Sequence, residues 1–134
     1  MTEPVPARHV LTILAVAEME RSRAFYDRAF GWRKEVDLPV YCEYSLPGGM
    51  LLGLYRREGF ARNTGIAPAA VPAGAITATE IYLRVEDLPA AVAALEAAGA
   101  RLLSPAAVRD WGDEAAYFAD PDGNVLVAAR PKPS

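Results

Sequence analysis

The sequence contains, at residues 117–127, the stretch Tyr-Phe-Ala-Asp-Pro-Asp-Gly-Asn-Val-Leu-Val, which reads as a strand, a tight turn and a second strand. Pro121 pre-sets the backbone angle φ in the turn, and Gly123 tolerates a positive φ. Apolar residues flank the turn on both sides, as in a β-hairpin. A weaker copy, Tyr-Ser-Leu-Pro-Gly-Gly-Met-Leu, occupies residues 44–51. This repetition indicates that the chain is built from two similar halves.

The elements around the two turns recur in the same order. In the first half, hydrophobic spacing predicts a helix at residues 18–30 that ends at Gly31. The strands expected there cover residues 8–16, 32–36, 40–46 and 50–56. In the second half, Asp87 is the expected N-cap of a helix that Gly99 closes. The strand-forming segments expected there cover residues 76–85, 100–104, 107–111, 114–119 and 124–129.

Both halves are expected to share one domain, because neither is long enough to close a stable core alone. The 134 residues of the chain suit a single domain. We predict an α+β fold with two β-α-β-β-β modules, at about residues 8–57 and 76–130. Residues 58–75, rich in Gly, Pro and Ala, are the expected connecting loop. Loops of this length are usually functional or mobile, so a lid is the alternative to a plain surface crossover.

The composition is typical of an ordinary globular protein and limits the classes of partner that we expect it to bind. The formal net charge of −3 gives no electrostatic reason to expect binding to nucleic acid or to an anionic membrane. No apolar run approaches the ~20 residues of a membrane-spanning helix. The single cysteine, Cys42, excludes an internal disulfide and a thiol-based zinc cluster. Residues 1–6 do not resemble a signal peptide, so we expect a cytoplasmic protein.

Two motifs carry a resemblance to a known superfamily. Residues 16–26, Val-Ala-Glu-Met-Glu-Arg-Ser-Arg-Ala-Phe-Tyr, resemble the first-module signature of the glyoxalase, bleomycin-resistance and extradiol-dioxygenase superfamily, also called vicinal oxygen chelate. The hairpin at residues 117–124 resembles the second-module signature. The resemblance covers nearly the whole chain. It implies that the paired modules form a curled mixed sheet around a cleft, and that the protein is a homodimer.

The resemblance also locates four strand positions that hold a divalent ion in metal-dependent members. Aligning the signatures places them on Leu11, Gly53, Glu80 and Val127. Three of these residues offer no donor side chain, and one carboxylate cannot hold a divalent ion against water. The resemblance therefore implies a member without a metal or another cofactor. His9 shares a strand face with Leu11, so a metal-dependent member with displaced ligands, including His9 and Glu80, is an alternative.

Aromatic residues and one carboxylate mark the predicted cleft. Glu80 lies in an apolar strand, where an unpaired carboxylate is costly, and by position it faces the cleft. Tyr82 shares its strand face, and Trp111 precedes a strand near the rim. Tyr44 and Tyr55 are expected on the face of Gly53, although any of these rings could instead fill the core. The candidate ligand-binding residues are Glu80, Tyr82, Tyr44, Tyr55, Trp111 and His9.

We therefore expect a metal-free, bleomycin-resistance-like protein that sequesters a small organic molecule, either a drug or a metabolite. An aromatic cleft with one carboxylate suits an aromatic or cationic ligand, through stacking and cation–π attraction. The alternative is a lyase or isomerase of the same superfamily in which Glu80 acts as the general base.

Overall fold

The computed structural model describes residues 2–132 and contains two modules that repeat one topology. Module one consists of β1 (Leu11–Val16), α1 (Met19–Phe30), β2 (Arg33–Asp37), β3 (Tyr41–Ser45) and β4 (Leu51–Arg56). A short helix, α2 (Arg57–Thr64), follows it. Module two consists of β5 (Glu80–Arg84), α3 (Leu88–Ala97), β6 (Arg101–Val108), β7 (Asp113–Ala119) and β8 (Val125–Pro131).

Each module forms its own four-stranded mixed sheet. The strand orders are β1-β4-β3-β2 and β5-β8-β7-β6, so the two sheets have equivalent topologies. In each sheet the first strand pairs in parallel with the last, and the other neighbours are antiparallel. The predicted α+β class and the two β-α-β-β-β modules are therefore confirmed. The curled sheet around the cleft is divided into two sheets that do not close into a barrel.

The helices form where the sequence places their apolar positions and caps. In α1 the buried residues recur at helical spacing, and they are Met19, Ser22, Phe25, Tyr26 and Ala29. Gly31 ends this helix with φ 61°, the left-handed conformation expected of a glycine C-cap. At the start of α3, the Asp87 side chain accepts a hydrogen bond from the Ala90 amide at 3.0 Å. Both predicted caps are therefore present.

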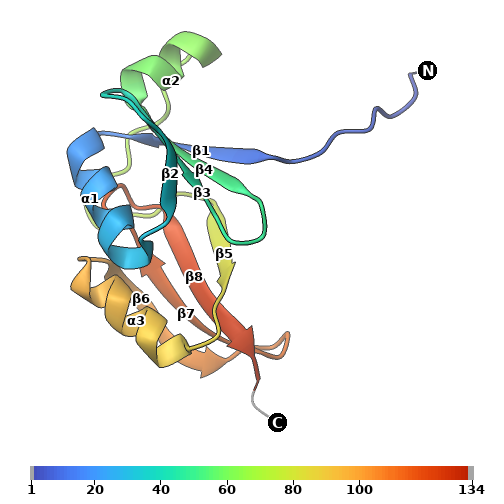
Figure 1. Ribbon diagram of the computed structural model, residues 1–134, viewed down its shortest axis with the longest axis vertical. Helices are drawn as coiled ribbons and strands as arrows, with labels where there is room; N and C mark the ends of the chain where they lie inside the picture. The colour runs from blue at the N-terminus through green and yellow to red at the C-terminus, as the bar shows by residue number, and fades with distance from the viewer. Residues whose placement is uncertain (1, 133–134) are drawn as a thin grey trace.

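One hydrophobic core joins the two modules. Helices α1 and α3 pack against each other and lie on the same side of the molecule (Figure 1). The core includes Leu54 and Tyr44 from the first sheet and Phe118 and Leu126 from the second. Because neither sheet buries its apolar face alone, the modules depend on each other for stability.

The turn at residues 120–123 fastens module two to module one. Asp122 accepts hydrogen bonds from the Ala17 amide and from the Ser22 hydroxyl, both at 3.0 Å. The N-cap residue of α1, Glu18, makes no side-chain capping bond. Asp122 of the second-module turn therefore holds the chain just before α1 and the Ser22 side chain within α1.

Several predicted boundaries need correction. Residues 57–64, expected as the end of module one and the start of the connecting loop, form α2, which ends at Gly65 with φ 81°. Its buried residue is Gly59, on which the Tyr55 ring packs, so the helix lacks a recognisable apolar stripe. The strand expected at residues 76–85 begins only at Glu80. The segments expected at 100–104 and 107–111 merge into one edge strand, β6, whose register shifts around Pro105 and which ends at Val108, so that residues 109–111 belong to the following turn.

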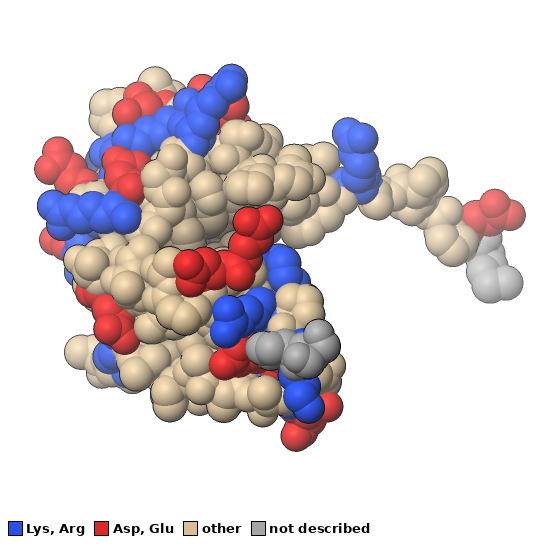
Figure 2. All heavy atoms as spheres, turned by 60° about the horizontal axis from the view of Figure 1, so that its bottom comes forward, with Lys and Arg blue, Asp and Glu red and all other residues tan. Residues whose placement is uncertain are grey.

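The surface carries both charge signs. On the face in Figure 2, acidic and basic side chains are interspersed, without a broad patch of either sign. The segment before β1 extends away from the body of the molecule (Figure 1), although strand 8–16 was expected to begin there. Within residues 2–132, no helix is long and apolar enough to cross a membrane.

Candidate ligand-binding site

The outer face of the second sheet, which points away from the helices, carries three of the six predicted site residues: Glu80, Tyr82 and Trp111. Side chains alternate along β5, so Ile81 packs against the core while Glu80 and Tyr82 point outward and are exposed. Trp111 lies in the turn between β6 and β7, which is closed by a hydrogen bond from the Gly112 amide to the Arg109 carbonyl at 3.0 Å. The structure thus brings Tyr82 and Trp111 to one face.

Tyr82 and Trp111 are held together by Asp113, a residue that the sequence did not single out. The Trp111 indole Nε1 donates to the Tyr82 hydroxyl at 2.8 Å, and that hydroxyl donates to Asp113 Oδ2 at 2.6 Å. Arg84 forms an ion pair with the same carboxylate oxygen at 3.1 Å. We call Tyr82, Trp111 and Asp113 the aromatic group.

Neighbouring groups shift the pKa values of Asp113 and Tyr82 within the aromatic group. The hydrogen bonds from Arg84 and then from Tyr82 lower the pKa of Asp113. Desolvation and the hydrogen bond to Asp113 raise the pKa of Tyr82, so its hydroxyl keeps its proton at neutral pH. The hydrogen bonds from Trp111 to Tyr82 and from Tyr82 to Asp113 orient both rings, although Trp111 is 58% exposed and Tyr82 is 40% exposed.

A cavity of about 480 Å³ adjoins Trp111. It is lined by Ser104, Val108, Arg109, Asp110, Trp111 and Tyr117. The Arg109 guanidinium lies over the Tyr117 ring, 4.9 Å from its centroid, and donates to Ser104 Oγ at 3.1 Å. It also donates to the Ala115 carbonyl at 2.8 Å. The Arg109 side chain therefore forms part of the cavity wall, and its donors are engaged by Ser104 and Ala115.

Glu80 lies near the Tyr117 side of this cavity. Desolvation and, to a smaller extent, the Glu80 charge raise the pKa of the Tyr117 hydroxyl. Glu80 itself is exposed at the start of β5. A carboxylate thus accompanies the exposed rings of Tyr82 and Trp111 on this face.

The four positions that hold a metal ion in related proteins do not fit one here. Gly53 has no side chain, and the Tyr41 ring covers it, because a Cβ at Gly53 would lie 2.6 Å from the Tyr41 hydroxyl. Val127 is fully buried in an apolar cluster. Among residues 2–132, no three His, Cys, Asp or Glu side chains gather as metal ligands would. The donor chemistry at Leu11, Gly53, Glu80 and Val127 does not suit a divalent cation.

Two of the remaining predicted residues lie elsewhere. His9 is exposed before β1, with Nε2 3.0 Å from Thr12 Oγ1, and it contributes neither to the aromatic group nor to the adjoining cavity. Tyr44 was expected on the face of Gly53, and this expectation is wrong. The register pairs Glu43 with Gly53, so Tyr44 points into the core, where its hydroxyl donates to Asp27 Oδ1 at 2.9 Å.

Tyr55 does share the face of Gly53, together with two residues that the sequence analysis missed. The Tyr41 ring packs edge-on against Tyr55 with ring centroids 5.5 Å apart, and its hydroxyl donates to Glu43 Oε1 at 2.6 Å. Counting outward from the Pro47-Gly48-Gly49 turn pairs Glu43 with Gly53, so the correct register was available from the turn. Module one thus has its own aromatic residues and carboxylate on its outer face.

The family of the chain follows from its sequence and fold together. The chain belongs to the glyoxalase-like domain family, whose model matches residues 11–128. The fold is similar to that of a glyoxalase-related enzyme from Fulvimarina pelagi, with 26% identity and a TM-score of 0.81 over 92% of this chain and 87% of that one. A protein from Agrobacterium tumefaciens solved by NMR is also 26% identical, with a TM-score of 0.75 over 96% of this chain and 100% of that one.

A more distant relative shows the breadth of the fold. A lactoylglutathione lyase from Agrobacterium tumefaciens has a TM-score of 0.70 at 20% identity, over 94% of this chain and 95% of that one. At this identity the likeness concerns the fold alone. Among curated proteins, none has a sequence that matches this chain significantly.

Proposed function

We propose that this protein binds a flat, aromatic or cationic organic molecule at the outer face of module two, without a metal ion. The observation that carries the proposal is the hydrogen-bonded pair of exposed rings, Tyr82 and Trp111, beside a cavity of about 480 Å³. That volume lies within the range of about 300–1,000 Å³ typical of small-molecule sites. Large exposed aromatics next to a cavity commonly mark recognition surfaces.

Charge supports a cationic or electron-poor ligand. The carboxylates of Glu80 and Asp110 lie on the open face or cavity wall, whereas Arg109 is committed to Ser104 and to backbone carbonyls. A cation over the face of Trp111 would gain about 0.5–2 kcal/mol from cation–π attraction. Within residues 2–132 neither carboxylate forms an ion pair, so both would add long-range attraction.

The fixed orientation of the Tyr82 and Trp111 side chains supports a ligand-binding role for this face. Asp113 holds the Tyr82 hydroxyl, which in turn holds the Trp111 indole. A ligand that stacks on Trp111 would therefore not have to immobilise a free side chain, which typically costs about 0.5–1.5 kcal/mol. Sequestration of a drug or metabolite needs such a site and no chemical step.

The proposal is tested by titrating the protein with the planar cation proflavine and with its uncharged relative acridone, while following tryptophan fluorescence. We expect proflavine to quench Trp111 saturably, and Trp111→Ala to abolish binding when binding is followed by isothermal titration calorimetry, which does not depend on the removed fluorophore. The second tryptophan, Trp32, stacks on Phe30 with centroids 4.1 Å apart and serves as an internal control. Glu80→Gln should weaken proflavine binding more than acridone binding. Saturable binding that survives Trp111→Ala would overturn the proposal.

Glu80 beside Tyr117 supports a second candidate, a lyase or isomerase in which Glu80 removes a proton. A carboxylate and a phenol on one open face can serve as a base and a hydrogen-bond donor to the same substrate. Turnover that disappears in Glu80→Gln while ligand binding persists would favour this candidate over sequestration.

We further propose that two copies of the chain associate. Edge strand β6 exposes Leu102 and Val108, at 46% and 53%. Edge strands with apolar side chains are natural surfaces for pairing. Sedimentation velocity tests this, and a Val108→Lys variant should shift the distribution toward single chains.

A further inference from the structure

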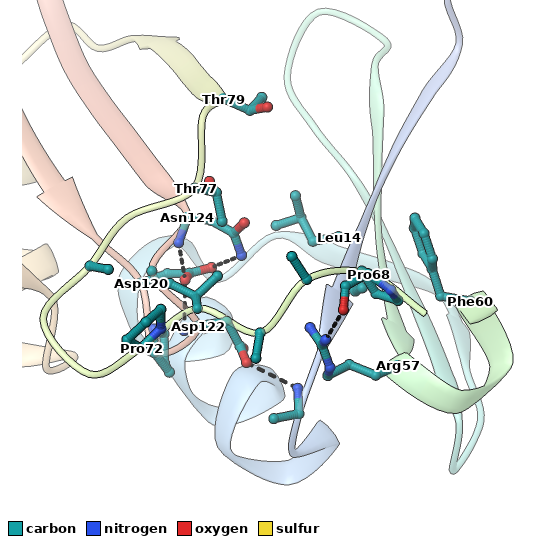
Figure 3. A pocket seen from close by; sticks show the side chains of 18 of the residues that line it. Leu14, Arg57, Phe60, Pro68, Pro72, Thr77, Thr79, Asp120, Asp122 and Asn124 are labelled. Carbon is teal, nitrogen blue, oxygen red and sulfur yellow. Dashed lines mark hydrogen bonds between the residues drawn. The ribbon is translucent and has the colours of Figure 1, made fainter. Parts of the chain in front are cut away.

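A second and larger cavity lies beneath the segment that connects the modules, defined here as residues 65–79. Its volume is about 750 Å³, within the range of small-molecule sites. Figure 3 shows the connecting segment running across it, with Phe60 and Pro68 toward one end and Thr77 and Thr79 toward the other. No residue of the aromatic group lines this cavity, so it is separate from the site proposed above.

Much of the cavity wall is apolar. The apolar lining residues come from β1, from α2 and from the connecting segment, and they include Ile13, Leu14, Phe60, Val71 and Pro72. The hydrocarbon part of a ligand would bind favourably against this wall, because binding removes apolar surface from water.

The connecting segment is attached to the turn of module two and forms a defined wall. The Thr77 amide donates to the Gly123 carbonyl at 2.8 Å. A Cβ at Gly123 would lie 2.9 Å from the Ala75 carbonyl oxygen and 2.9 Å from Val71 Cγ1, so only glycine permits this approach. The cavity is therefore bounded on this side by ordered backbone.

The acidic residues in the cavity are already engaged. Asp120 accepts hydrogen bonds from Tyr26 at 2.6 Å and from the Asn124 side chain at 3.0 Å, as well as from two backbone amides. Asp122 accepts from Ser22 and pairs with Arg21 at 3.3 Å. These carboxylates have little capacity left to attract a cationic ligand.

Two lining arginines, by contrast, have no acidic partner in the part of the chain that the structure describes. Arg57 donates to the Pro68 carbonyl, and Arg101 donates to the Gly74 and Ala75 carbonyls at 3.1 and 3.4 Å. Within residues 2–132, neither guanidinium forms an ion pair. Each guanidinium offers five N–H donors, so donors remain for an anion.

A third polar group in the cavity wall is the Thr77 side chain. The Thr77 hydroxyl oxygen is buried and makes no hydrogen bond to residues 2–132. An unsatisfied buried hydroxyl is costly unless a ligand or water completes it. Thr77 thus adds a hydrogen-bonding group to a cavity whose uncompensated charge is positive.

We propose that this cavity is a second binding site, which takes a small apolar carboxylate, with Arg57 and Arg101 facing its charge and Thr77 contributing a hydrogen bond. The apolar wall accepts the hydrocarbon part. The probe that tests the site is sodium hexanoate, followed by isothermal titration calorimetry, with hexan-1-ol as its uncharged counterpart and inorganic phosphate as an anion without a hydrocarbon part.

We expect saturable binding of hexanoate and much weaker binding of hexan-1-ol and phosphate. Arg57→Gln should weaken hexanoate binding by about 10-fold or more, the effect of removing one charge-assisted hydrogen bond. Arg57→Lys, which keeps the charge, should lose less. Thr77→Val should weaken binding severalfold. Arg56→Gln is the matched control, because Arg56 pairs with Glu58 and does not line the cavity.

The same titrations can overturn the proposal. Equal affinity for phosphate would show a plain anion site, and equal losses in Arg57→Gln and Arg57→Lys would show that the contact to Pro68, not the charge, matters. Absence of saturable hexanoate binding would exclude the site. Trp111→Ala should leave hexanoate binding unchanged, so this result does not depend on whether the module-two face binds proflavine.

Discussion

The hydroxyl of Tyr26, in the first helix, donates a hydrogen bond of 2.6 Å to Oδ2 of Asp120, in the turn between the last two strands. Tyr26 is fully buried, and Asp120 is 6% exposed. The two residues are 94 positions apart in the sequence, and their contact joins the modules at the core. The stability of the whole domain should therefore respond to this single contact.

Removing the hydroxyl should destabilise the protein. Tyr26→Phe leaves the ring in place and removes one of the donors to a buried carboxylate. We expect the free energy of unfolding to fall by about 1.5–3 kcal/mol, as for hydrogen bonds to charged groups. Urea denaturation measures the loss. Tyr117→Phe is the control, because the Tyr117 hydroxyl makes no hydrogen bond to residues 2–132, and a loss of equal size there would contradict the argument.

The same turn should make stability depend on pH. Burial raises the pKa of Asp120 above its ordinary value of 3.8, although the hydrogen bonds from Tyr26 and Asn124 oppose the shift. A carboxyl group with a raised pKa in the folded state binds its proton more tightly there. Its contribution to stability is therefore complete below pH 3.8 and declines as the pH rises through the raised pKa.

Asp120→Asn should remove this pH dependence, because asparagine does not titrate. We expect the difference in unfolding free energy between the native protein and this variant to shrink as the pH rises above 3.8. Urea denaturation at a series of pH values measures it. A difference that grows with pH would mean that the hydrogen-bond donors outweigh burial and lower the pKa of Asp120.

The aromatic group separates binding from stability. Tyr82→Phe removes the acceptor of the Trp111 indole and the donor to Asp113. Because Tyr82 is exposed, we expect stability to change by less than about 0.5 kcal/mol. Proflavine affinity should nevertheless fall severalfold, since Trp111 loses its orientation. Tyr55→Phe, in the other module, should leave the affinity unaltered; an equal loss in both variants would contradict the assignment of the site.

The covering of Gly53 by Tyr41 predicts an interaction between these two positions. Gly53→Ala would place a Cβ 2.6 Å from the Tyr41 hydroxyl and 2.9 Å from Cε1. The ring must then shift and strain its bond to Glu43, so we expect a loss of about 1–3 kcal/mol, typical of overpacking. In a Tyr41→Ala background the same change should cost much less. A double-mutant cycle with no coupling energy would show that the ring does not occupy this space.

The sequence by itself determined the features that depend on neighbouring residues. Local capping and turn chemistry determine where α1 ends, at Gly31, where α3 begins, at Asp87, and where the two turns lie. Local periodicity determines the alternation that exposes Glu80 and Tyr82. Such signals need no partner from elsewhere in the chain. The internal repeat then made the two-module α+β fold predictable.

Only the tertiary structure decided the features that join distant segments. The placement of Tyr44 depends on the register of β3 against β4, and helix α2 is held where the Tyr55 ring packs on Gly59. The aromatic group needs Trp111 and Asp113 to meet Tyr82 across about thirty intervening residues. The cavity beneath the connecting segment requires the module-two turn to dock on α1. Such contacts are set by how the core packs, and periodicity shows which face of an element is buried but not which distant residues meet there.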